Sequence, residues 1–189
     1  MSHVALIGDS IFDNKAYTDG GPDVITHLRE QLPDGWQATL QAIDGATIAA
    51  VYEQLDRVPE DASHVVLSVG GNDALLHIGI IDRPARSASE VFAELAEIAA
   101  TFKAEYRTLL DTLLSRFDTV LVCTVYHPPL YDDRTRFLIG PALAVFNNVI
   151  VEAAVSAGVS IIDLRQVCTE ENDFANEIEP SMTGGSKIA

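Results

Sequence analysis

The sequence predicts an α/β protein with a five-stranded parallel sheet and helices on both faces, and three observations support this. Short apolar runs alternate with longer stretches of helical period, which is typical of strand–helix–strand units. No repeat or low-complexity tract interrupts this alternation in the sequence. The 189 residues are 48% hydrophobic, enough for one sizeable core, so we expect a single domain over residues 1–189.

Five apolar runs are the expected strands, because each is short and is bounded by polar or turn-forming residues. In chain order they cover residues 4–7, 38–43, 64–69, 119–125 and 159–164. The segments between them are long enough to cross over the sheet, so a parallel arrangement is expected.

The segments between these strands supply the crossover helices. Residues 91–117 carry apolar side chains at spacings of three and four, which predicts one long helix whose apolar stripe belongs to the core. Residues 20–32, 47–55 and 134–157 form the other crossovers. The end of the sequence, from Gly184, resembles the opening of a final helix that is either very short or truncated.

The charge balance excludes several classes of partner. The formal net charge of -16 at pH 7 repels nucleic-acid phosphates and anionic membrane surfaces, and the few basic residues are scattered. A neutral or cationic small-molecule substrate fits this field better. The apolar run at residues 4–7 leaves no room for a signal peptide, and no segment suggests a membrane span, so we expect a cytoplasmic protein. Cys123 and Cys168 are then expected to be structural thiols.

Polar residues collect directly after the first four expected strands. In an open parallel sheet, ligands bind beyond the carboxyl ends of the strands, so these segments are where chemistry is expected. They read Gly8-Asp9-Ser10, Asp44-Gly45-Ala46-Thr47, Gly70-Gly71-Asn72-Asp73 and Tyr126-His127-Pro128-Pro129. A serine hydroxyl, a glycine N–H and an asparagine amide at one edge would supply a nucleophile and the donors that a developing oxyanion needs.

These residues and their order resemble the SGNH/GDSL hydrolases, which include esterases, lipases, thioesterases and carbohydrate deacetylases. The resemblance covers nearly the whole chain and implies a three-layer flavodoxin-like fold. It implies that Ser10 is the catalytic nucleophile and that the Ser10 and Gly45 amides and the Asn72 side chain form an oxyanion hole. Asp9 stands in the nucleophile block as a supporting residue, and Asp73 is expected to brace its loop. No cofactor and no metal are implied.

The last block departs from the family pattern. Family members usually carry Asp-x-x-His before Pro-Ser, whereas this sequence has Asn176 and Glu179 at those two positions before Pro180-Ser181. A carboxylate with an ordinary pKa is a poorer base than histidine near neutral pH, unless burial raises its pKa. Glu179 is therefore one candidate base. His127 is another, because it follows the fourth strand, and His77 is a more distant candidate.

Three classes of function remain open from the sequence. The first is a serine ester hydrolase with an altered general base, acting on a small ester or acylated substrate. The second is a binding module that keeps the cleft and the donors but turns over slowly or not at all. The third treats Asp9, Asp44 and Asp73 as an acidic cluster that holds Mg²⁺ for phosphoryl chemistry.

Overall fold

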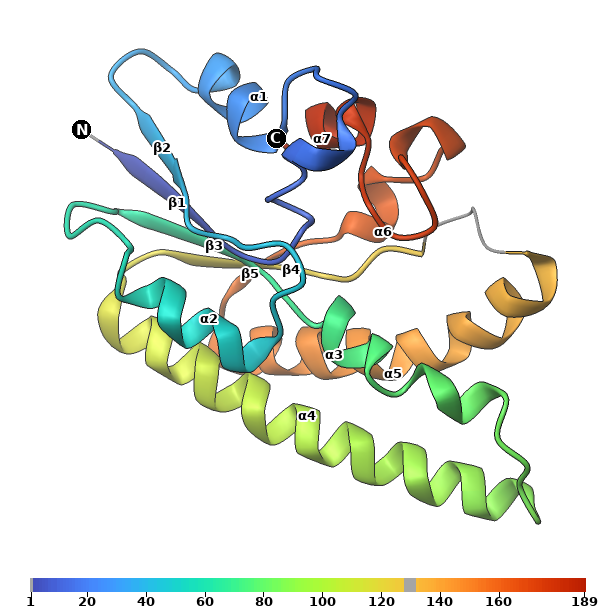
Figure 1. The fold of residues 1–189 in the computed structure, drawn as a ribbon. Coiled ribbons are helices and arrows are strands. Elements are labelled where there is room, and N and C mark those ends of the chain that lie inside the picture. Colours follow the sequence, from blue (N-terminus) through green and yellow to red (C-terminus); the bar gives the residue numbers. More distant parts are fainter. Residues whose placement is uncertain (1, 128–131) are drawn as a thin grey trace.

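The computed structural model describes residues 2–127 and 132–189, and it has the predicted five-stranded parallel sheet (Figure 1). The strands are β1 (His3–Gly8), β2 (Gln37–Leu40), β3 (His64–Ser68), β4 (Val120–Cys123) and β5 (Ser160–Ile162). Their order is β2-β1-β3-β4-β5, and all neighbours are parallel. This is the flavodoxin-like order, in which ligands bind where the order reverses between β1 and β3.

Helices cover both faces of the sheet. The α-helices are α1 (Val24–Gln31), α2 (Ile48–Leu55), α3 (Gly71–Leu75), α4 (Ala88–Arg116), α5 (Asp133–Ala157), α6 (Leu164–Val167) and α7 (Met182–Ile188). Short 3₁₀ helices are η1 (Lys15–Tyr17), η2 (Ile78–Ile81) and η3 (Glu171–Asp173). In Figure 1, α2, α4 and α5 lie on one side of the sheet, whereas α1, α6 and α7 lie on the other. The predicted three-layer fold is therefore confirmed.

Two hydrophobic cores follow from the alternation of side chains along the strands. Ala5 and Ile7 of β1 pack on the side of α2, α4 and α5, whereas Val4 and Leu6 pack on the side of α1, α6 and α7. Successive strand residues point to opposite faces, so one short apolar run serves both cores.

The expected strands 38–43, 119–125 and 159–164 are shorter in the structure, because their last residues leave the sheet at its carboxyl edge. Side chains replace part of the missing strand pairing. Asn147 of α5 accepts a hydrogen bond from Val125 N and donates to Val125 O, both at 2.8 Å. The backbone of Val125 is thus held by Asn147 although it lies outside the sheet.

One helix, α3, differs from the sequence prediction. Gly70-Gly71-Asn72-Asp73 was expected as a loop, but α3 begins at Gly71, so Asn72 and Asp73 lie in its first turn. Helix α5 continues through Pro141. By length and composition, α5 is the one helix among the described residues that is long and apolar enough to cross a membrane. Buried core helices share this property, and α5 packs against α4 in the core.

Candidate active site

Ser10 follows β1 at the edge where the strand order reverses. Gly8 has φ +127°, and a Cβ on it would overlap the carbonyl of Ser68, so only glycine lets β1 end this close to β3. The turn then closes through bonds from Phe12 N and Asp13 N to Asp9 O, both 3.1 Å. Ser10 is 5% exposed, and its backbone N–H donates to no residue within the described ranges. Ser10 therefore offers both a side-chain hydroxyl and a backbone N–H that has no acceptor among the described residues.

Two further donors come from the neighbouring loops. Gly45 has φ +79°, and its N–H also lacks an acceptor among residues 2–127 and 132–189. Asn72 Nδ2 donates to Ala46 O at 3.0 Å, which ties α3 to the residue after Gly45 and leaves the second amide proton available. Ser10 and Asn72 line the same pocket, whereas Gly45 is exposed and does not line it. The fold thus gathers the predicted donors along one edge.

Asp73 has a structural partner. Its carboxylate accepts from Ile48 N, with 3.2 Å to Oδ1 and 3.3 Å to Oδ2, and so stabilises the start of α2. Burial raises the pKa of Asp73, and these backbone bonds act in the opposite direction. Asp73 therefore joins α3 to α2.

Glu179 lies on a tight turn built around Asn176. Asn176 Oδ1 accepts from Ile178 N at 2.8 Å and from Glu179 N at 2.9 Å, and Ala175 N donates to Glu179 O at 2.9 Å. A bridge between Phe174 and Pro180 closes the turn. Asn176 stands at the position of the family's aspartate, and its observed contacts fix the backbone of Glu179.

A buried asparagine fixes this turn beside the loop that follows β1. Asn14 Nδ2 donates to Pro180 O at 3.1 Å, while Asn14 Oδ1 accepts from Val24 N at 3.0 Å. Asn14 is 0% exposed, so these bonds join the loop after β1, the start of α1 and the segment before α7 in a setting without water. Glu179 is thereby held near Ser10 although the two are far apart in sequence.

The Glu179 carboxyl is half-buried and close to Ser10. Burial raises its pKa, and hydrogen bonding with the Ser10 hydroxyl opposes that rise, while the charge of Asp44 adds to it. Glu179 Oε2 is buried without a hydrogen-bond partner among the described residues. The carboxyl thus lies near Ser10 with one oxygen that no described residue pairs.

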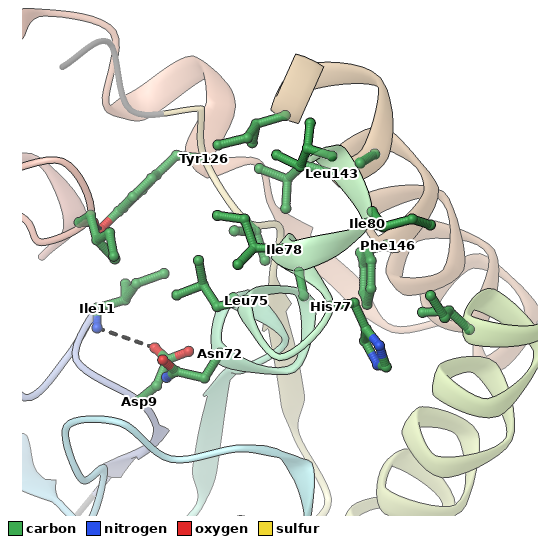
Figure 2. A pocket seen from close by; sticks show the side chains of 18 of the residues that line it. Asp9, Ile11, Asn72, Leu75, His77, Ile78, Ile80, Tyr126, Leu143 and Phe146 are labelled. Carbon is green, nitrogen blue, oxygen red and sulfur yellow. Dashed lines mark hydrogen bonds between the residues drawn. The ribbon is translucent and has the colours of Figure 1, made fainter. Parts of the chain in front are cut away.

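Asp9 is a second perturbed carboxyl at this edge. It is 2% exposed, and burial raises its pKa to about 8, with smaller contributions from the charges of Glu179 and Asp73. Its Oδ1 accepts from Ile11 N at 3.1 Å (Figure 2). Asp9 is therefore neutral at pH 7, and it adds no negative charge beside Ser10 there.

Among the described residues, neither candidate histidine has a hydrogen bond with Ser10. His127 is exposed and does not line the pocket, and its pKa is lowered by burial and by the charge of Arg165, against a raising effect of Asp163. Its neighbours Pro128 and Pro129 fall outside the described residues. His77 lines the pocket, but Figure 2 shows its ring on the far side from Asp9.

The three aspartates of the magnesium hypothesis have separate partners. Asp9 bonds to Ile11, Asp73 bonds to Ile48, and Asp44 Oδ2 accepts from Tyr17 OH at 2.6 Å. Within the described ranges, no group of three or more histidine, cysteine or acidic side chains is arranged to hold a metal ion. The sequence reasoning missed Tyr17, whose only signal was its place in the loop after Ser10.

An apolar pocket of about 900 Å³, including the part open to solvent, starts at Ser10 (Figure 2). Leu95 and Ile98 of α4 line it. The apolar stripe of this helix was expected to be core, and this is wrong for Leu95, whereas Ile98 packs against the core and also lines the pocket. Residues from Phe102 to Leu113 do pack in the core, but the first turns of α4 extend past the sheet and face the pocket.

Comparison with protein families decides the affiliation of the chain. The model of the GDSL-like lipase/acylhydrolase family matches residues 6–182, nearly the whole chain. The chain belongs to this family. The resemblance predicted from its sequence blocks is therefore confirmed, while no curated protein matches the chain.

Solved structures support the GDSL-like fold. An extracellular lipase from Streptomyces rimosus has a TM-score of 0.72 at 19% identity, over 99% of this chain and 96% of the lipase. Phospholipase A1 from Streptomyces albidoflavus has a TM-score of 0.70 at 16% identity, covering 98% and 95% of the two chains. The acetylxylan esterase Axe2 from Geobacillus stearothermophilus has a TM-score of 0.69 at 16% identity, covering 100% and 90%. At these identities the likeness shows the fold alone.

Proposed function

We propose that this GDSL-like protein is a carboxylic ester hydrolase in which Ser10 is the nucleophile and Glu179 is the general base. The observation that supports it most directly is that the half-buried Glu179 carboxyl lies near enough to the Ser10 side chain for that side chain to lower its pKa, while burial raises the pKa. A base is most useful when its pKa lies near the working pH, and desolvation moves Glu179 in that direction.

The first half of the reaction acylates the enzyme. Glu179 accepts the proton of Ser10 Oγ, and Oγ forms a bond to the ester carbonyl carbon. The carbonyl oxygen becomes an oxyanion, for which the N–H groups of Ser10 and Gly45 and the free amide proton of Asn72 are the proposed donors. Collapse then breaks the bond to the leaving alcohol, which takes the proton from Glu179.

The second half restores the enzyme. Glu179, again a carboxylate, accepts a proton from water while the water oxygen bonds to the acyl carbon. The tetrahedral intermediate breaks its bond to Ser10 Oγ, which recovers the proton from Glu179. The neutral state of Asp9 favours both halves, because a charged Asp9 would repel the developing oxyanion.

The leaving alcohol takes its proton from Glu179, so it lies near that residue. The acidic residues there define the substrate class that we propose. Asp44 and Glu179 act on each other electrostatically, and Tyr17 donates to Asp44. Anionic leaving groups would be repelled there, so the substrate is a neutral or cationic ester.

The test compares three variants on a p-nitrophenyl ester. Ser10→Ala should abolish hydrolysis, and Glu179→Gln should lower kcat by about 10²- to 10⁴-fold, the usual contribution of a general base. Glu177→Gln is the matched control, because Glu177 is exposed on the same turn, and it should keep wild-type kcat.

Two outcomes would overturn this assignment. Wild-type activity in Glu179→Gln would show that another group is the base, and wild-type activity in Ser10→Ala would place the chemistry elsewhere. A folded wild type without activity on any ester, but with a measurable affinity for substrate analogues, would favour the binding-module hypothesis.

A further inference from the structure

We infer that Tyr126 is a positioning residue for the proposed base, because its hydroxyl holds the turn that carries Glu179 against the segment after β4. This inference rests on the proposed function. Tyr126 OH donates to Ile178 O at 2.7 Å, although the two residues are far apart in sequence. Ile178 directly precedes Glu179, so this bond acts on the peptide group that leads into the base.

The peptide group between Ile178 and Glu179 is bonded on both sides. Its N–H, which belongs to Glu179, donates to Asn176 Oδ1 at 2.9 Å within the turn. Its carbonyl, which belongs to Ile178, accepts from Tyr126 outside the turn. A peptide group is planar and includes the Cα of the following residue, so these two bonds together fix the orientation of the plane in which the Glu179 Cα lies.

The ring of Tyr126 contacts the other arm of the same turn. It packs edge to face against Phe174, with 5.0 Å between the ring centroids and 82° between the planes. Phe174 in turn forms the bridge to Pro180 that closes the turn, and both aromatic side chains are buried. The hydroxyl and the ring of one residue therefore hold the two arms of the turn together.

Tyr126 is itself attached to the core of the protein. The backbone of the preceding residue, Val125, bonds through its N–H and its carbonyl to the side chain of Asn147 on α5, both at 2.8 Å. Asn147 is buried, so water does not compete for these bonds. The turn of Glu179 is thus connected through Tyr126 to a core helix, in addition to its connection through Asn14 to the segment after β1.

The Tyr126 hydroxyl is a donor at every pH at which the protein would work. Burial raises the pKa of Tyr126 well above its ordinary value, and the charges of Asp9, Glu179 and Cys168 add to the rise. The ring lines the pocket, whereas Figure 2 shows the hydroxyl pointing away from Ile78 and Leu143. Removal of the hydroxyl alone therefore releases Ile178 O and leaves the aromatic wall of the pocket in place.

The main test is Tyr126→Phe, with Tyr106→Phe as the matched control. Tyr106 is also fully buried against a phenylalanine, Phe102, but its hydroxyl has no hydrogen-bond partner among the described residues. Tyr126→Phe should lower kcat per folded molecule about tenfold through misplacement of the base, and it should leave KM within about twofold because the ring stays. Tyr106→Phe should keep both wild-type values. An unchanged kcat in Tyr126→Phe would overturn the inference.

The pH profile separates positioning from a loss of stability. Release of the turn admits water to the Glu179 carboxyl, so its pKa, which burial raises, should fall and activity should rise at lower pH than in the wild type. The Ser10 hydroxyl and Asp44, which also act on this carboxyl, are unchanged in Tyr126→Phe. A loss of folded protein lowers activity without moving this rise. A lower kcat with the rise at its wild-type pH would therefore contradict positioning.

A double variant tests whether Tyr126 acts through Glu179. In a background of Glu179→Gln, Tyr126→Phe should change kcat by less than about twofold, because the base that it positions is already lost. A further tenfold fall in the double variant would show that Tyr126 acts on another group, and it would overturn the inference.

Amide hydrogen exchange keeps the inference independent of catalysis. The N–H of Glu179 should exchange at least about tenfold faster in Tyr126→Phe, while the N–H groups of β1 and β3 keep their wild-type rates. Unchanged exchange at Glu179, with kcat lost in Glu179→Gln, would overturn the role of Tyr126 and leave the proposed function intact. Faster exchange at Glu179, with wild-type kcat in Glu179→Gln, would overturn the proposed function and leave Tyr126 as the residue that holds this turn.

Discussion

The proposed nucleophile, Ser10, and the proposed base, Glu179, are held in place by different means. Ser10 follows a central strand, and the contact of Gly8 with Ser68 and the hydrogen bond from Asp9 N to Ser68 O at 3.0 Å fix it to the sheet. Glu179 lies outside the sheet, on a turn that depends on the side chains of Asn176 and Asn14. A residue on a turn that is fixed by local hydrogen bonds can be replaced by another residue type without disturbing the hydrophobic core.

The departures of this sequence from the family pattern follow the same division between the sheet and the turn. The first three blocks, around Ser10, Gly45 and Asn72, keep the residues expected for the family, and the sheet places them along one edge. The last block replaces the usual aspartate and histidine by Asn176 and Glu179. The asparagine has taken up a backbone role there, since both bonds to its Oδ1 come from main-chain N–H groups.

Apart from the changes at Ser10 and Glu179 themselves, the largest effect is expected on the sheet side of the comparison, at Asn72. Asn72→Ala should lower kcat by about 10²- to 10³-fold, the usual cost of losing one oxyanion donor. The same change removes the bond to Ala46 O and should lower the free energy of unfolding by about 1 kcal/mol. Urea unfolding and kcat per folded molecule, measured together, separate the two effects. A stability loss with unchanged kcat would make Asn72 purely structural.

A smaller effect is expected on the turn side, at Asn176. Asn176→Ala removes both bonds that fix the backbone of Glu179, so kcat should fall about tenfold or more through misplacement of the base. Asn176→Asp keeps the acceptor oxygen and should retain most of the activity. Activity should still rise with pH in both variants, since neither removes the Glu179 carboxyl, but the added negative charge of Asn176→Asp should move that rise to higher pH. Equal rates in Asn176→Ala and the wild type would contradict a positioning role.

The sequence predicted the surroundings of Ser10 at the edge of the sheet far better than the surroundings of Glu179 on its turn. Strand and helix periodicity, with the family blocks, identified the five strands and the residues at their carboxyl ends. Periodicity could not show that Leu95 and Ile98 line a pocket, because a side chain against a cavity and one against a neighbour have the same spacing. The role of Asn176 depends on backbone hydrogen bonds within four residues, and the residue types alone do not specify them.

The smallest effect on kcat at neutral pH is expected at Asp9, which precedes Ser10 and whose pKa the charge of Glu179 helps to raise. Because its pKa is about 8, Asp9 is neutral at pH 7, and Asp9→Asn, which keeps an acceptor for Ile11 N, should change kcat at pH 7 by less than about threefold. Wild-type activity should rise with pH as Glu179 ionises and fall above about pH 8 as Asp9 gains charge. Asp9→Asn should remove the fall and leave the rise.

The same pKa predicts how stability depends on pH. Folded Asp9 keeps its proton up to about pH 8, whereas the carboxyl of the unfolded chain loses it near its ordinary pKa of 3.8, so the unfolded state binds fewer protons between these values. The stabilising contribution of neutral Asp9 is complete below about pH 4 and is lost as pH rises towards 8. Urea midpoints of the wild type should therefore decline from pH 5 to pH 8 more steeply than those of Asp9→Asn. Parallel declines in the two proteins would show that Asp9 ionises normally in the fold, and the fall in activity above pH 8 would then need another group.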